Sequence, residues 1–148
     1  MSPIILVING PNLNMLGIRE PEKYGKKTLE QIIDKAKEIA KSQNFTIKSF
    51  QSNHEGELVD YIQREGLNAD GIVINAGAYT HTSIAIRDAL LSVQAKFVEV
   101  HLSNVFSREP FRFHSFLSDK AIGVITGFGE NSYYLGIEAL IDLISKRE

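Results

Sequence analysis

Ile4–Asn9 reads IILVIN, five aliphatic residues that end at an asparagine, and Gly10-Pro11 follows directly. A run that is apolar at every position is typical of a strand buried on both faces, as in the centre of a parallel sheet. Gly and Pro after such a run end the strand and begin a loop. The stretch therefore predicts a central strand of a parallel sheet.

Four further short runs alternate with helical patterns along the chain. The runs span residues 45–51, 71–75, 97–102 and 121–126, and the helical patterns span 28–42, 56–65, 82–93 and 131–146. This alternation predicts an α/β fold, a doubly wound five-stranded parallel sheet of flavodoxin-like type. With no linker or internal repeat, we expect residues 1–148 to form a single domain.

Composition excludes several classes of protein. The 148 residues include 16 Lys+Arg against 18 Asp+Glu, a net charge of -2, which argues against nucleic acid as a main partner. The absence of Cys excludes disulfides, thiolate metal sites and a Cys nucleophile. The N-terminal apolar run is too short for a membrane span and follows no basic segment, so we expect a soluble, cytoplasmic domain without membrane contact.

Polar residues gather where the predicted strands end. In open α/β sheets, ligands bind outside the carboxyl ends of the strands, and long connections there are usually functional. Residues 10–27 and 103–120 form two such connections, and all four histidines fall on this edge or in its loops: His54, His81, His101 and His114. Neither G-x-x-x-x-G-K-[ST] nor G-x-G-x-x-G follows the first strand, and no H-x-x-x-H or H-E-x-x-H is present, so we expect no nucleotide cradle and no metal site.

Acid–base chemistry fits this edge better. Glu99 and His101 are two residues apart in a predicted strand, so they point to the same face. A carboxylate beside an imidazole fixes its tautomer and raises its pKa, which makes a proton donor near neutral pH. A simple buried ion pair is the alternative interpretation.

The first long loop offers a base in Tyr24. Lowering a phenol pKa from ~10 to ~7 takes about 4 kcal/mol of preferential stabilisation of the phenolate, and Arg19 is the candidate cation. A phenolate suits removal of a weakly acidic C–H next to a ketone. An exposed loop tyrosine and a solvated arginine are the alternatives.

The turn after residue 75 leads into a predicted helix. Thr80, Thr82 or Ser83 is expected to cap it, and spacing places His81 and Asp88 on one helical face. Asp88 is alternatively a solvated residue or the partner of Arg87. With Arg108 and Arg112 nearby, the edge suits a small polyhydroxy carboxylate, bound either by a carbon–oxygen lyase or by a non-catalytic, flavodoxin-like module for an anionic metabolite.

The chain contains NGPNLN at residues 9–14, followed by Leu16-Gly17, Arg19-Glu20-Pro21 and Tyr24-Gly25, and then QSNHEG at 51–56, NAGAYTHTS at 75–83, EVHLSN at 99–104 and REPFR at 108–112. Taken together, these stretches closely resemble the type II 3-dehydroquinate dehydratases. The resemblance implies a hydro-lyase that converts 3-dehydroquinate to 3-dehydroshikimate, step three of the shikimate pathway to chorismate and the aromatic amino acids. It implies an anti elimination through an enolate, without a cofactor or a Schiff base.

The resemblance also implies roles for individual residues in catalysis. Tyr24 would accept the proton, with Arg19 stabilising its phenolate. His101 would protonate the departing hydroxyl, oriented by Glu99. Asn12 would contact the enolate oxygen.

The remaining implied roles concern binding and assembly. Asn75, His81 and Arg112 would bind substrate hydroxyls. Leu102 and Ser103 would hold the carboxylate, largely through backbone N–H groups. Asp88 would act across a subunit boundary in trimers, commonly four to a dodecamer, and residues 17–27 would form a lid.

Overall fold

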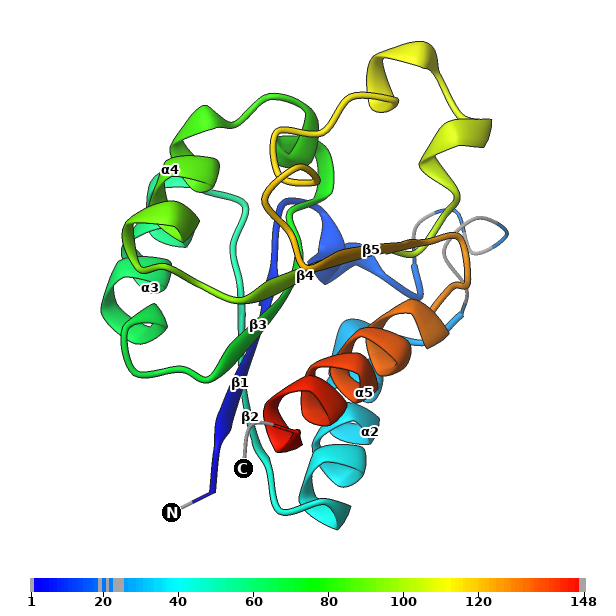
Figure 1. The fold of residues 1–148 in the computed structure, drawn as a ribbon. Coiled ribbons are helices and arrows are strands. Elements are labelled where there is room, and N and C mark those ends of the chain that lie inside the picture. The colour runs from blue at the N-terminus through cyan, green and yellow to red at the C-terminus, as the bar shows by residue number, and fades with distance from the viewer. Residues whose placement is uncertain (1, 19, 21, 23–25, 147–148) are drawn as a thin grey trace.

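A parallel sheet forms the centre of the molecule (Figure 1). The computed structural model describes residues 2–18, 20, 22 and 26–146. Within them, five strands pair in the order β2-β1-β3-β4-β5, with every adjacent pair parallel. Their bounds are β1 Ile4–Asn9, β2 Thr46–Gln51, β3 Gly71–Asn75, β4 Phe97–His101 and β5 Gly123–Thr126. This is the predicted flavodoxin-like topology, with β2 and β5 at the edges.

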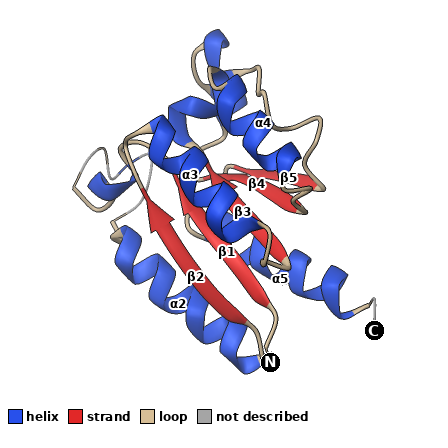
Figure 2. Ribbon diagram, turned by 90° about the vertical axis from the view of Figure 1, so that its left-hand side faces the viewer, coloured by secondary structure: helices blue, strands red, loops and turns tan. Residues whose placement is uncertain are grey.

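Helices cover both faces of the sheet (Figure 2). One layer contains α2 (Leu29–Ser42) and α5 (Asn131–Ser145), and the other contains α3 (Glu55–Gly66) and α4 (Ile84–Ser92). The β1 strand shows why its run is apolar throughout. Ile5 and Val7 pack into the core under α2 and α5, whereas Leu6 and Ile8 pack into the core under α3 and α4. Alternate side chains of a strand point to opposite faces, so a strand between two helical layers has no polar side.

Side-chain caps set two of the helix starts. Thr28 Oγ1 accepts from Gln31 N at 3.2 Å while Thr28 N donates to Gln31 Oε1 at 3.0 Å, a capping box that begins α2. Among the candidates for the α4 cap, the structure selects Ser83, whose Oγ accepts from Ile86 N at 2.9 Å. The predicted start of α4 at residue 82 is therefore two residues early.

The two long connections contain short 3-10 helices. The first carries η1 (Leu13–Met15), and the second carries η3 (Val105–Ser107) and η4 (Pro110–Arg112), while η2 (Gly77–His81) follows β3. Among the described residues, no helix has the length and apolar character needed to cross a membrane.

A close backbone approach joins the ends of β1 and β3. Gly10 N donates to Asn75 O at 2.8 Å, and a Cβ built on Gly10 would lie 2.2 Å from the backbone oxygen of Ala76. Two strand ends can meet this tightly only where one residue lacks a side chain.

Replacing Gly10 with alanine should therefore separate the two strand ends. We expect Gly10→Ala to lower the free energy of unfolding by roughly 2–3 kcal/mol, the usual cost of overpacking a rigid site, measured by urea denaturation. Gly56→Ala is the matched control, because a Cβ there meets nothing within 4 Å and the residue lies in α3. The control should be neutral or slightly more stable than wild type. Equal stability of the two variants would contradict the close-approach argument.

Candidate active site

A cavity of about 110 Å³ opens at the carboxyl ends of β1, β3 and β4. In the strand order β2-β1-β3-β4-β5, the strands after β1 are added first on one side of it and then on the other. This switch between β1 and β3 is where open α/β sheets place their ligands. The lining includes seven of the predicted site residues: Asn12, Asn75, His81, His101, Leu102, Ser103 and Arg112. The structure thus brings together side chains from four separate segments of the chain.

The other predicted site residues lie elsewhere. Glu99 is buried behind His101, with 2% of its surface exposed. Asp88 is exposed on α4 and does not line the cavity of its own chain. Arg19 and Tyr24 lie outside the described residues, as does part of the expected lid, residues 17–27.

The expected helical face shared by His81 and Asp88 is wrong. Backbone turns of the 3-10 type run from Gly77 to His81, and α4 begins only at Ile84. The regular spacing is interrupted, so the two side chains belong to different elements. Asp88 is also not the hydrogen-bond partner of Arg87, whose guanidinium instead donates to Asp119 at 2.5 and 3.1 Å.

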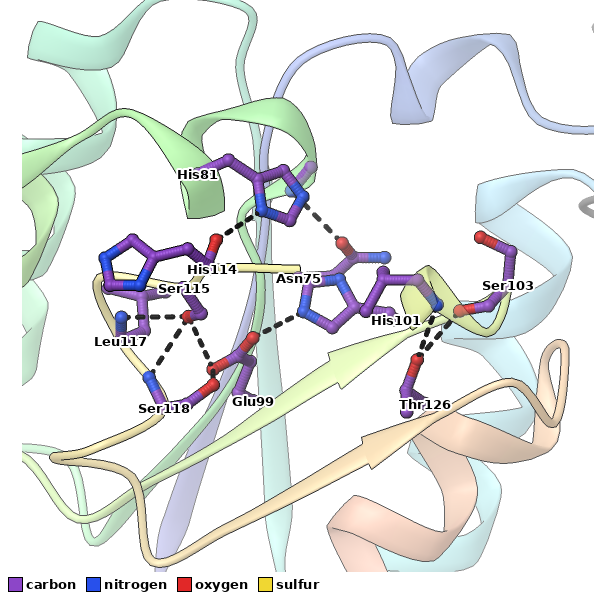
Figure 3. Close-up of polar contacts among 12 residues, drawn as sticks. Asn75, His81, Glu99, His101, Ser103, His114, Ser115, Leu117, Ser118 and Thr126 are labelled. Carbon is purple, nitrogen blue, oxygen red and sulfur yellow. Dashed lines mark hydrogen bonds and ion pairs between the residues drawn. The ribbon is translucent and has the colours of Figure 1, made fainter. Parts of the chain in front are cut away.

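The predicted contact between Glu99 and His101 is present. His101 Nε2 lies 2.5 Å from Glu99 Oε2, and both side chains are almost fully buried (Figure 3). Burial opposes ionisation of Glu99, but hydrogen bonds from His101, Ser118 and Ser115 outweigh it and bring the Glu99 pKa below its ordinary value. An ionised carboxylate only accepts hydrogen bonds, so Nε2 of His101 carries the hydrogen. Nδ1 is then the nitrogen that can exchange a proton with a ligand.

His81 has the opposite arrangement. Its Nδ1 lies 2.8 Å from the backbone oxygen of His114, and a carbonyl oxygen only accepts (Figure 3). Burial lowers the pKa of His81, and the nearby His101 and Arg112 lower it further, against the raising effect of the His114 hydrogen bond. His81 is therefore neutral at neutral pH, protonated on Nδ1, with Nε2 as a hydrogen-bond acceptor. The two cavity imidazoles, 6.3 Å apart between ring centres, are thus set for different tasks.

Asn75 is held by a buried network that the sequence did not reveal. Its Nδ2 donates to Tyr133 Oη at 3.0 Å, and its Oδ1 accepts from Gly77 N at 3.1 Å. Tyr133 in turn donates to Asn9 Oδ1 at 2.5 Å. Burial raises the pKa of Tyr133 well above its ordinary value, so the phenol stays neutral and donates. Asn75 keeps one amide hydrogen for a ligand.

The loop after β2 supports the loop after β1. Asn12 adopts a left-handed backbone conformation, with φ of 71°, and its N–H donates to Asn53 Oδ1 at 3.0 Å. Gln51 Nε2 donates to the same oxygen at 3.2 Å and to Gly10 O at 3.1 Å. The QSNHEG motif therefore fixes the path of the chain beside the cavity, while His54, which precedes α3, does not line it.

Among the described residues, the charged side chains in the cavity lining are cationic. Arg108 and Arg112 line it together with the two histidines, and no carboxylate does. Arg112 Nε donates to Glu109 Oε1 at 3.0 Å, which orients the guanidinium from outside. A site of this charge favours an anionic ligand.

Comparison with known proteins identifies the family. Residues 3–141 match the family model for Dehydroquinase class II. The chain belongs to this family.

Individual class II dehydroquinase relatives cover nearly the whole chain. It is 58% identical over 141 residues to the 3-dehydroquinate dehydratase of Prochlorococcus marinus subsp. pastoris, covering 95% of this chain and 97% of the relative. It is 56% identical over 138 residues to the catabolic 3-dehydroquinase of Penicillium rubens, covering 93% and 89%. The crystal structure of type II dehydroquinase from Butyrivibrio crossotus superposes with a TM-score of 0.91 at 50% identity, covering 94% and 97%. The family fold thus agrees with the predicted one.

Removing the Tyr133 hydroxyl should test the network under this dehydroquinase site. We expect Tyr133→Phe to lower the free energy of unfolding by about 2 kcal/mol, because two buried amides lose a partner. Urea denaturation measures the change. Tyr134→Phe is the control, since the Tyr134 hydroxyl donates to Glu130, which keeps Lys27 at 3.1 Å. A Tyr133→Phe protein no less stable than Tyr134→Phe would refute the role of the network.

Proposed function

We propose that this chain dehydrates 3-dehydroquinate to 3-dehydroshikimate, the third step of the shikimate pathway, as a hydro-lyase. The observation that carries the proposal is the buried Glu99–His101 pair at a cationic cavity in a member of the class II dehydroquinase family. A module that only bound an anionic metabolite would have no use for an imidazole oriented by a buried carboxylate. This pair and the membership in the dehydroquinase family both favour an enzyme over a module that only binds a metabolite.

The proposed reaction is an anti elimination through an enolate. A base removes a proton from the carbon next to the ketone, and the electron pair moves onto the carbonyl oxygen. The hydroxyl on the next carbon then leaves as water, taking a proton from His101 Nδ1, and a carbon–carbon double bond forms. The leaving group is a poor one, so protonation in the transition state contributes about 10²–10⁴-fold to the rate.

The other roles follow the motifs. We assign Tyr24 as the base and Arg19 as the cation that stabilises its phenolate, and Asn12 as the group nearest the enolate oxygen. Backbone N–H groups of Leu102 and Ser103 would hold the substrate carboxylate. None of these steps calls for a cofactor or a metal ion.

Three side chains of the cavity lining would bind the substrate hydroxyls. His81 Nε2 would accept a hydrogen from a hydroxyl, because its Nδ1 is already committed to the His114 carbonyl. Asn75 and Arg112 would donate to hydroxyl oxygens. The neutral state of His81 supports this assignment, since an imidazolium could not accept.

Turnover of authentic substrate tests the function directly. Purified protein mixed with 3-dehydroquinate should produce a conjugated enone, followed as rising ultraviolet absorbance. We expect Tyr24→Phe to lower kcat by about 10²–10⁴-fold with little change in KM, because the hydroxyl acts in the transition state. Tyr61→Phe is the control, because Tyr61 stacks on Phe50 and does not line the cavity. Binding of substrate without any enone would favour the non-catalytic module.

We further propose that the chain assembles into trimers, four of which form a dodecamer, and that Asp88 completes a neighbouring subunit's site. Its exposed position on α4, outside its own cavity, supports this role. We expect Asp88→Asn to reduce activity or assembly by roughly tenfold, because it removes one charge-assisted contact. An enzyme assay measures the activity, and sedimentation velocity measures the assembly. Asp142→Asn is the control, since Asp142 on α5 pairs with Lys146 of its own chain. Intact trimers with full activity in Asp88→Asn would exclude the interface role.

A further inference from the structure

Glu99 uses its two carboxylate oxygens for different partners. Oε2 contacts His101, whereas Oε1 accepts from Ser118 Oγ at 2.6 Å and from Ser115 Oγ at 3.1 Å (Figure 3). Neither serine lines the cavity, so neither can contact a substrate held there. Both lie in the segment between η4 and β5, which no sequence motif for chemistry had singled out.

Hydrogen bonds hold the segment between η4 and β5 so that the hydroxyls of Ser115 and Ser118 point at the Glu99 carboxylate. Ser115 Oγ accepts from the backbone N–H groups of Leu117 at 2.9 Å and Ser118 at 3.1 Å, which fixes the turn between the two serines. On the outside, Arg87 of α4 donates to Phe116 O at 2.8 Å and to both carboxylate oxygens of Asp119. Because Ser115 already accepts two backbone hydrogens, its hydroxyl hydrogen is left for Glu99.

We propose that Ser118, supported by Ser115, is a positioning residue that keeps Glu99 ionised and aimed at His101, so that the proton of the pair stays on the imidazole. The inference rests on the proposed function, in which His101 gives that proton to the departing hydroxyl. A carboxylate buried this deeply otherwise takes up a proton itself. A protonated Glu99 would neither hold the His101 tautomer nor stabilise its positive charge.

The hydroxyl hydrogen bonds account for the charge state of the carboxylate. Burial alone would raise the pKa of Glu99, and the donors, Ser118 among them, reverse the shift. The other titratable or charged side chains near the pair are His81 from η2 and, from the loop beyond β4, Arg112 together with Arg108, which lines the same cavity as His101. None of them is altered by a change at Ser118, so a change in titration can be traced to the lost hydroxyl.

The test compares Ser118→Ala with wild type over the acid range of pH. Loss of one hydrogen bond to a charged group should raise the pH at which the Glu99–His101 pair titrates on the acid side by about one unit. The ¹³C resonance of the Glu99 carboxyl, assigned by its loss in Glu99→Gln, reports this inflection without any substrate. In the enone assay, the acid limb of kcat should move by the same amount, and KM should not change because Ser118 does not line the cavity.

Two controls separate positioning from mere structural support. Ser118→Thr keeps the hydroxyl and should titrate like wild type. Ser107→Ala removes a hydroxyl that donates to Asn104 O, away from Glu99, and should do the same. Should Ser118→Ala not fold, Ser118→Cys keeps a weak S–H donor and should show a smaller shift in the same direction.

If the carboxyl of the folded variant titrates at the same pH as in wild type, the proposal is overturned. If the inflection moves but wild type produces no enone, the proposed function fails while the role of Ser118 stands.

Discussion

A negative charge placed almost out of reach of water is the constraint around which this site is built. Removing a carboxylate from water costs several kcal/mol even after the protein relaxes, and Glu99 in the middle of β4 is 2% exposed. Three side-chain donors compensate that cost: an imidazole on the same strand and two hydroxyls from a loop. Because the imidazole is one of those donors, its hydrogen bond to Glu99 also fixes its tautomer. Nε2 carries the hydrogen, and Nδ1 is left to exchange a proton with a ligand.

The same principle distinguishes the two histidines of the cavity. His101 faces a carboxylate, which takes the hydrogen bond from Nε2, while His81 faces a backbone carbonyl and is partly buried, and its pKa is lowered. A donor and an acceptor thus lie 6.3 Å apart on nearly parallel rings, although the residue type is identical. Neighbouring partners, rather than the side chain itself, assign the role.

Short-range patterns were enough to predict the architecture and the contact between Glu99 and His101. The apolar run of β1 and the alternation of strands with helices gave the sheet, and spacing of two in a strand placed Glu99 beside His101. Helical spacing gave a wrong prediction for His81 and Asp88, because the chain forms a 3-10 helix up to His81 and α4 begins only after the cap at Ser83. Local sequence does not encode which of several competing hydroxyls will find a backbone N–H.

What local pattern could not supply is contact between distant segments. Tyr133 reaches Asn9 across 124 positions, and Ser118 reaches Glu99 across 19, with no periodicity to announce either hydrogen bond. Both contacts are buried polar interactions, and buried polar groups need partners wherever the fold can provide them. A sequence that places a Glu in a fully buried strand therefore implies donors elsewhere in the chain. The sequence of β4 shows that Glu99 needs hydrogen-bond donors. Which residues donate is known only from the structure, where the loop between η4 and β5 packs against β4.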